Sequence, residues 1–233
     1  MNEVTYYPDF KEIPLPDYYL ELKANQIDIG IDFILNQYAE RHGISIGALL
    51  TDEKIQAITE GKVATVADFK EETRLMVKEI QAEAQFENAI MTFIRTYLVE
   101  TAKYIVDAAE MDDYIRMRRL EVQAQLDERD LPMEQYLAEV FDVAEDKWAT
   151  FQEVLEEEYI FQRVIAPQWF VDQGGDYSEV GYDAYVQHQV MHRGADELVV
   201  REAFSYPQYV ENIGAMTYQA AMATYFMPKI KWV

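Results

Sequence analysis

The stretch TVADFKEETRLMVKEIQAEAQFENAIMTFIRTYL, residues 65–98, predicts one long amphipathic helix. Thr65 followed by Asp68 three positions later is typical of a capping box at a helix start. The apolar side chains that we expect on its buried face recur at helical spacing: Phe69, Met76, Ile80, Phe86, Ile90, Phe93, Ile94, Tyr97 and Leu98. A long helix in the middle of the chain favours a helical fold.

The residues before this stretch predict two further helices. Leu20, Ala24, Ile27, Ile31, Ile34 and Tyr38 follow one another at spacings of three and four. We expect this helix to begin at an Asp17 cap and to end at Gly43, with Gly30 weakening it slightly. A short helix is expected over residues 51–59, ending before Gly61. Prolines make residues 1–16 extended and turn-like.

The residues after it repeat the same pattern. Asp107 and Glu110 form a second capping signature, and Pro132 sits where a first helical turn tolerates proline. Further helices are expected over 145–165, 178–192, 195–204 and 208–226, with breaks at Gly174-Gly175, Gly194 and Tyr206-Pro207. Strand signals are nearly absent. The predicted fold class is therefore all-α, with long helices and short joints.

Composition and charge exclude several classes of protein. The 233 residues include 43 acidic and 20 basic side chains, a net charge of −23, and no cysteine. Such a surface disfavours nucleic acid and anionic membranes as partners. The lack of cysteine excludes disulfide scaffolds and cysteine-ligated metal sites. The N-terminal residues do not resemble a signal peptide, and the apolar run 220–227 is too short to span a bilayer, so we expect a cytoplasmic protein.

Motifs for catalysis are scarce. The sequence has no phosphate-binding glycine loop, no Gly-x-Ser-x-Gly elbow and no Glu-x-x-His pair. His188 and His192, four residues apart on one expected helix, are weak candidates for metal ligands, with Asp196 or Glu197 as a third ligand. The zinc-protease motif has Glu after its first His, whereas Gln189 follows here. Two surface histidines at a helix end are the simpler interpretation, and His42 is interpreted in the same way.

Two features of the acidic and aromatic residues bear on binding. The acidic runs 112–113 and 156–158 are interpreted as solvated helix faces, because consecutive helix positions do not face one another. The chain also holds 17 Tyr, 11 Phe, 3 Trp and 10 Met. Many of these side chains belong to a core, but a slender helical protein has little interior in which to bury them. Binding of apolar peptide segments is therefore an alternative to plain core packing.

Several motifs, in order along the chain, resemble those of the C-terminal helical domain of trigger factor, a bacterial ribosome-associated chaperone. They are Tyr7-Pro-Asp-Phe-Lys11, the seam from Leu20 to Tyr38, Thr65-Val-Ala-Asp-Phe-Lys-Glu-Glu-Thr-Arg74, Phe86-Glu-Asn-Ala-Ile90, Met111-Asp-Asp-Tyr-Ile115 and Leu131-Pro-Met-Glu-Gln-Tyr-Leu137. The aromatic helix ending at Ile165-Ala166 and a glycine-marked turn follow in the order of the family. The resemblance covers most of the chain, although each motif is degenerate.

The sequence departs from the family in two places. It contains no Gly-Phe-Arg-x-Gly-x-x-Pro ribosome-docking loop, and only residues 41–64 stand where the family has its prolyl-isomerase domain. So short a segment cannot form that domain, so the isomerase activity does not transfer. The expected organisation is one domain over 1–233, with a first arm segment at 1–43, a short connector at 44–64 and a main helical body at 65–233.

The resemblance implies an ATP-independent holdase, without enzymatic activity or cofactor, that binds unfolded or nascent polypeptides on the inner faces of helical arms. The acidic charge favours basic clients, and an apolar cradle favours a homodimer. The candidate client-binding residues are Tyr114, Met117, Phe141, Trp148, Trp169, Phe170, Met216, Tyr218 and Phe226. A helical interaction or assembly protein with one dedicated partner is the main alternative, and a metal-dependent helical enzyme is a third.

Overall fold

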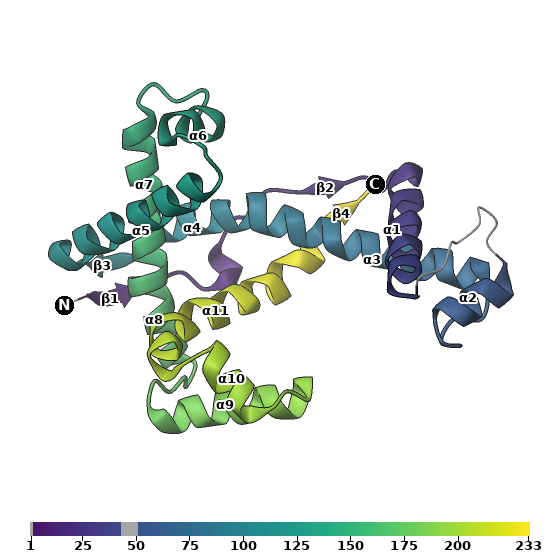
Figure 1. The fold of residues 1–233 in the computed structure, drawn as a ribbon. Coiled ribbons are helices and arrows are strands. Elements are labelled where there is room, and N and C mark those ends of the chain that lie inside the picture. Colours follow the sequence, from purple (N-terminus) through teal and green to yellow (C-terminus); the bar gives the residue numbers. More distant parts are fainter. Residues whose placement is uncertain (1, 43–50) are drawn as a thin grey trace. The chain divides into compact units, whose positions relative to one another are not determined.

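A computed structural model describes residues 2–42 and 51–233, and it is mostly helical (Figure 1). This confirms the all-α fold class. The chain packs as two compact units. The first unit comprises Met1–Leu15 and Thr92–Thr224, and the second comprises Pro16–Met91 and Tyr225–Val233. The expected single domain with boundaries after 43 and 64 stays a prediction, and residues 43–50 lie outside the described residues.

The second unit is built around the crossing of two helices. It contains β2 (Tyr19–Leu20), α1 (Ala24–His42), α2 (Asp52–Ile58), α3 (Val66–Gln85), a π-helical segment (Phe86–Ile90), a 3-10 turn (Met227–Lys229) and β4 (Lys231–Trp232). Its core joins α1, α2, α3 and the residues before α3 through Ile31, Ile55, Val63 and Phe69. β2 and β4 pair in parallel. The two ends of the unit's sequence are thereby held together.

Gly30 allows α1 to approach α3 closely. A Cβ atom at this position would lie 2.8 Å from Cγ2 of Val77 and 3.1 Å from Cγ2 of Thr73. The expectation that this glycine only weakens its helix is therefore incomplete, because it is also required by the helix crossing.

The expected start of α1 is wrong. The helix begins at Ala24, and Leu20 belongs to β2, so Asp17 does not cap it. The carboxylate of Asp17 instead lies 2.7 Å from Nζ of Lys231 in the strand region. The expected C-cap, Gly43, and the side chain of His42 lie outside the described residues.

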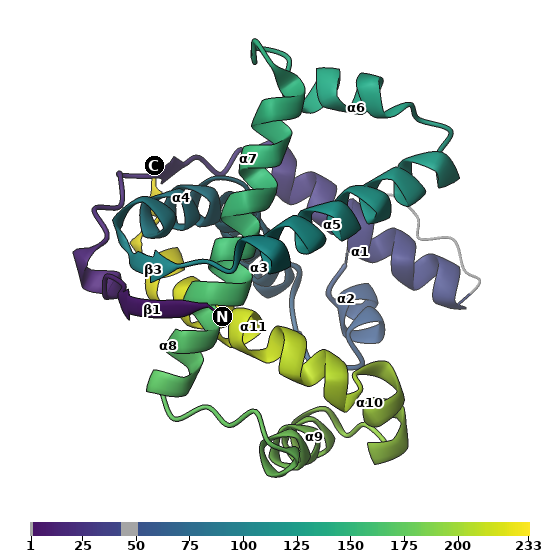
Figure 2. The same ribbon diagram turned by 90° about the vertical axis from the view of Figure 1, so that its left-hand side faces the viewer.

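The described residues of the first unit include two helical clusters with their own cores. Its elements are β1 (Glu3–Tyr6), a 3-10 turn (Phe10–Glu12), α4 (Met91–Thr101, from Thr92 on), β3 (Lys103–Ile105), α5 (Ala108–Glu128), α6 (Met133–Val140), α7 (Lys147–Tyr159), a π-helical segment (Ile160–Ile165), α8 (Ala166–Asp172), α9 (Glu179–Arg193), α10 (Glu197–Ala203) and α11 (Tyr206–Phe226, up to Thr224). One cluster packs α5, α6 and α7 together, and Figure 2 shows α6 between the end of α5 and the start of α7. The other packs α8, α9, α10 and α11.

Most of the expected helix boundaries are confirmed. The hydroxyl oxygens of Thr51 and Thr65 and the carboxylate of Asp107 accept hydrogen bonds from backbone N–H groups of the first turns of α2, α3 and α5. Gly194 ends α9 with φ of 62°, in the left-handed region. Residues 66–101 are helical throughout, with a π-helical segment at Phe86–Ile90.

Three expectations need correction. Tyr206-Pro207 does not separate helices, because α11 begins at Tyr206 and proline is tolerated in a first turn. Ile80 is exposed, although its spacing predicts burial. Short strands also form, since β1 pairs antiparallel with β3. Among the described residues, no helix combines the length and the apolar character needed to cross a membrane.

Candidate functional site

A surface recess lies beside α5 on the side facing the start of α7. It has a volume of about 520 Å³ and is called the Trp148 groove here; its lining residues are Asp112, Ile115, Arg116, Arg119, Leu120, Gln123, Met133, Trp148 and Gln152. The side chains of Leu120 and Trp148 remain 57% and 44% exposed. The groove therefore presents large apolar side chains to solvent, with charged groups around them.

Packing behind the groove holds these side chains in place. The ring of Trp148 meets that of Phe151 edge-on, with centroids 6.4 Å apart, and Phe151, also on α7, is buried in the core that α7 shares with α5 and α6. The guanidinium carbon of Arg119 lies 5.7 Å from the Trp148 ring centroid, and Nη2 of Arg119 donates a hydrogen bond of 3.2 Å to Gln152. The indole thus contacts Phe151 and Arg119 while nearly half of the side chain stays exposed.

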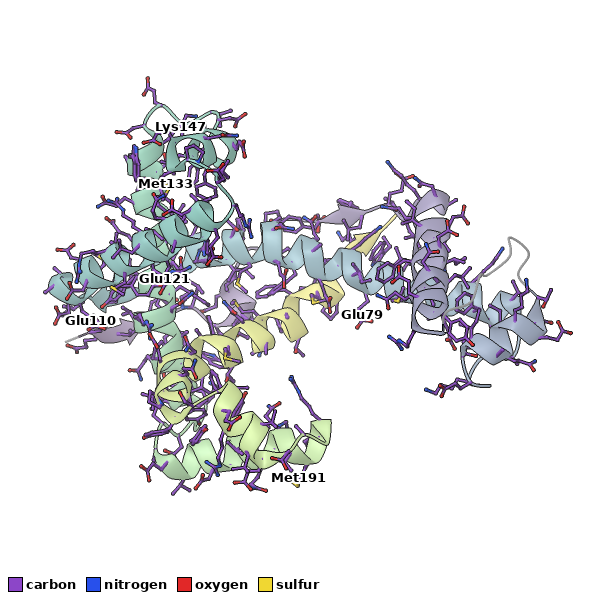
Figure 3. The ribbon with its side chains drawn as sticks, viewed as in Figure 1. Glu79, Glu110, Glu121, Met133, Lys147 and Met191 are labelled. Carbon is purple, nitrogen blue, oxygen red and sulfur yellow. The ribbon has the colours of Figure 1, made fainter. Side chains whose placement is uncertain are left out.

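Figure 3 helps to locate the groove. It labels Met133 at the start of α6 and Lys147 at the start of α7, both in the α5–α6–α7 cluster, and Glu110 and Glu121 along α5. Nζ of Lys147 donates a hydrogen bond of 2.7 Å to the backbone carbonyl of Phe141. This contact links the start of α7 to the end of α6.

A second recess, of about 450 Å³, lies on the opposite side of α5. Its lining comprises Glu110, Asp113, Tyr114, Met117, Arg118, Glu121, Tyr159, Arg163 and Glu211, and it is called the Tyr114 recess. At about 100° per residue, the α5 residues of the two recesses occupy opposite helix faces. Six of the nine residues that line the Tyr114 recess are charged, whereas the Trp148 groove is lined by three charged, two amide and four apolar residues.

The polar side chains that line the Tyr114 recess are bonded to one another and to neighbouring residues. The hydroxyl of Tyr114 donates to Oε1 of Glu158 at 2.9 Å, and Nε of Arg118 lies 3.2 Å from the same oxygen. Burial, followed by the charge of Glu158, raises the pKa of Tyr114, so its hydroxyl stays protonated at neutral pH. Arg163 pairs with Glu211 across the recess. These side chains bind one another, which leaves little free bonding capacity for a partner.

The acidic run 156–158 is only partly a solvated face. The side chain of Glu158 is 14% exposed and contacts Arg118 and Tyr114. Glu157 accepts a hydrogen bond of 3.1 Å from Thr96 and lies 3.9 Å from Nε of Arg95. Segments distant in sequence supply these partners, so spacing within the run could not reveal them. Asp113, by contrast, is exposed as expected and pairs with Arg116.

The candidate client-binding residues fall into three groups. Met117, Trp148 and Met216 are exposed, and Tyr114, Phe141 and Trp169 are half-buried. Phe170, Tyr218 and Phe226 are buried. The expectation that Phe170, Tyr218 and Phe226 contact clients is therefore corrected. Their side chains are buried in the interior and are not available to a client at the protein surface. Phe170 packs in the α8–α11 core, and Tyr218 packs against Trp169 and Phe161.

Sequence reasoning missed other exposed apolar residues of the α5–α6–α7 cluster. Leu120 lines the Trp148 groove, while Val140 and Val143 lie at and after the end of α6, with Val143 94% exposed. A signal for Leu120 was present in the sequence. It falls about 140° around the helix from Ile115, on the otherwise polar face of α5.

His188 and His192 contact each other on α9, with ring centroids 4.2 Å apart. The suggested third ligands are engaged elsewhere: Asp196 caps α10, and Glu197 pairs with Arg201 and accepts a hydrogen bond from Gln187. Within the described part of the chain, no three His, Asp or Glu side chains gather in a metal-binding group. The structure therefore adds nothing to the metal hypothesis.

The chain was compared with protein-family models, curated proteins and solved structures, and none of the three comparisons gives a significant match. The resemblance to trigger factor therefore rests on the motifs alone.

Proposed function

We propose that this protein is an ATP-independent holdase, similar to the helical chaperone domain of trigger factor. The observation that carries this proposal is the Trp148 groove, where Leu120 and Trp148 are exposed beside a rim of both charges. Exposed apolar patches rimmed by polar groups are typical of surfaces that bind other proteins. In the proposal the protein needs no cofactor and catalyses no reaction.

The chemistry of the groove suits many apolar segments rather than one sequence. A volume of about 520 Å³ accommodates a few side chains of a client, held by contact with an indole and a leucine. Burial of apolar area contributes about 25 cal/mol per Å² and has no directional requirement. Met133 lines the floor, and methionine adapts its shape to different partners. We therefore expect the groove to bind unfolded chains weakly and without selectivity for their sequence.

The charge of the whole chain supports the same function. At −23, bound complexes would repel one another, which opposes their aggregation. The charge also favours basic clients through long-range attraction. This preference depends on the whole chain, because the rim of the groove carries Asp112 together with Arg116 and Arg119.

Suppression of aggregation tests the proposal. Three unrelated denatured proteins are diluted with wild type, Leu120→Glu, or the control Met191→Glu, which adds a charge at an exposed position on α9 (Figure 3). We expect near-stoichiometric suppression of all three by wild type and by the control. Leu120→Glu should suppress less, because it places a charge among the apolar side chains of the groove.

The outcomes separate the rival functions. No suppression of any client would refute the holdase. Loss of suppression by Met191→Glu equal to that by Leu120→Glu would show that the groove is not the binding surface. Suppression of a single protein, with tight one-to-one binding, would favour the alternative of an interaction protein with one dedicated partner.

The client preference needs its own measurement. Suppression is compared for a basic and an acidic client of similar size, at low and at high salt. We expect the basic client to be held better at about 0.02 M salt, and the difference to shrink at about 0.5 M, where charges are screened within a few ångströms. Equal suppression of both clients at low salt would remove the preference for basic clients.

A further inference from the structure

A third cavity of the first unit lies between the N-terminal segment and α8. It has a volume of about 370 Å³, near the lower end of the range typical of ligand pockets, and it is called the Trp169 cavity. Its lining consists of Tyr7, Pro8, Asp9, Phe10, Glu12, Trp169 and Gln173. The cavity therefore combines aromatic side chains with carboxylates.

The charge of its lining is negative. Asp9 and Glu12 both line the cavity, and its described lining includes no Lys, Arg or His. Lys11 lies between them in sequence, but its side chain is exposed and does not line the cavity. Tyr7 donates a hydrogen bond of 2.6 Å to Asp172, which places a third carboxylate at a lining residue.

The two lining carboxylates are held in position by the backbone. Oδ1 of Asp9 accepts a hydrogen bond of 3.0 Å from the N–H of Lys11, and Oε2 of Glu12 accepts one of 2.7 Å from the N–H of Asp9. This reciprocal capping box fixes both side chains. A carboxylate has about four acceptor positions, so these bonds leave capacity for a further donor.

The aromatic side chains form a connected group. Phe10 and Trp169 stack with centroids 6.2 Å apart, and Tyr218 packs behind both, 5.3 Å from Phe10 and 4.7 Å from Trp169. The hydroxyl of Tyr218 is fully buried and has no hydrogen-bond partner. Burial raises its pKa, and the charges of Tyr7 and Asp9 raise it further. Tyr218 does not itself line the cavity, but its ring supports the two aromatic side chains that do.

We propose that the Trp169 cavity binds an organic cation, an alkylguanidinium or alkylammonium group. Aromatic faces attract such cations, and fixed carboxylates accept their N–H groups in charge-assisted hydrogen bonds. The alkyl part would contact Phe10 and Trp169, and the charged head would contact Asp9 and Glu12. The cation can come from an arginine or lysine side chain of a polypeptide or from a free polyamine.

This site is separate from the Trp148 groove, although Trp169 is also one of the candidate client-binding residues. None of its lining residues lines the Trp148 groove. Failure of one proposal therefore leaves the other standing, because Leu120→Glu alters only the groove, and the substitutions described next alter only the cavity.

Calorimetric titration of the whole protein with n-butylguanidinium tests the proposal, and n-butylurea serves as the neutral ligand of the same shape. We expect saturable one-to-one binding of the cation and none of the urea. In the double variant Asp9→Asn/Glu12→Gln, affinity should fall by about tenfold or more, because both charges are lost while oxygens that accept the backbone N–H groups remain. Trp169→Leu should weaken binding by about threefold to tenfold through loss of the aromatic face.

The control is Glu79→Gln/Glu83→Gln, which removes two exposed charges from α3 (Figure 3 labels Glu79). It should bind like wild type. Equal weakening in this control would mean that the cation responds only to overall charge, and the proposal would fail. It would also fail if wild type showed no saturable binding of the cation. The same holds if Asp9→Asn/Glu12→Gln bound the cation with wild-type affinity.

A second set of ligands separates the two sources of the cation. A short capped peptide with one arginine is compared with the same peptide carrying citrulline, and with spermidine. Tighter binding of the arginine peptide than of spermidine would assign the cavity to a polypeptide side chain. The reverse order would assign it to a free polyamine.

Discussion

Leu137 shows what a single side chain contributes to the α5–α6–α7 cluster. Its side chain is 1% exposed and packs with Ile115, Phe151 and Leu155. Leu137→Ala should lower the free energy of unfolding by about 2–5 kcal/mol, because it removes buried methyl groups and leaves a cavity. Val143→Ala is the matched control: it removes an apolar group that is 94% exposed and should change stability by less than about 0.5 kcal/mol.

Urea denaturation of both variants measures the difference. Similar small losses in the two variants would show that α6 does not form part of a cooperative core. A large loss in Leu137→Ala alone would confirm that α6 belongs to the cooperative core behind the Trp148 groove.

Tyrosine residues make the stability sensitive to alkaline pH. Burial raises the pKa of Tyr177 from 10.0 to about 12. The folded state thus binds the hydroxyl proton more tightly than the unfolded state does. The contribution to stability is therefore fully present below pH 10 and is lost as pH rises from 10 to 12.

Unfolding in urea at several pH values, with tyrosinate absorbance as a second signal, checks this prediction. We expect the urea midpoint to fall above about pH 10 in wild type and to fall less in Tyr177→Phe. The phenylalanine keeps the ring contact with Phe170, whose centroid lies 4.9 Å away. An equal fall in both proteins would contradict the role of Tyr177.

At the scale of elements, the crossing of α1 and α3 depends on the absence of a side chain at Gly30. Gly30→Ala should favour α1 as an isolated helix by about 1 kcal/mol. In the folded protein the new methyl would meet Val77 at 2.8 Å and Thr73 at 3.1 Å. We expect net destabilisation of about 1–3 kcal/mol, as for other overpacked contacts.

The double variant Gly30→Ala/Val77→Ala separates the two effects in thermal denaturation. It should be more stable than expected from the sum of the single changes, because the smaller residue 77 makes room for the methyl group. Strict additivity would mean that the helices do not meet at these residues.

The helix starts illustrate which elements local sequence can predict. Thr51, Thr65 and Asp107 each accept a hydrogen bond from a backbone N–H about one turn later, as their spacing predicts. A cap depends on residues within one turn, so it is visible in the sequence. The short strands are not visible in this way, because Tyr19 in β2 pairs with Lys231 in β4 from the other end of the chain.

At the scale of the whole molecule, a net charge of −23 destabilises the folded chain through self-repulsion. Screening by salt should therefore raise the melting temperature as NaCl is increased from about 0.02 M to about 0.5 M. Circular dichroism at each NaCl concentration measures the shift in melting temperature. The same series in KCl checks that the effect does not depend on which cation is used. A constant or falling melting temperature would show that surface ion pairs outweigh the repulsion.

The expected homodimer belongs to this scale as well and stays a prediction. Sedimentation of wild type and Leu120→Glu would test whether the Trp148 groove is its interface. A dimer that dissociates only in the variant would mean that the groove is covered by a second copy in the absence of clients.

The helical class, most helix boundaries and the acidic surface could be predicted from the sequence, because these properties depend on composition and on neighbours within one or two turns. Tertiary structure alone decided which apolar residues remain on the surface. Tyr218 is buried under Trp169, while Leu120, no less apolar, lies exposed in a groove. It also paired Glu158 with Arg118 and brought Asp9 beside Trp169. Burial and pairing depend on segments far apart in the chain, and no local pattern records which distant segments will meet.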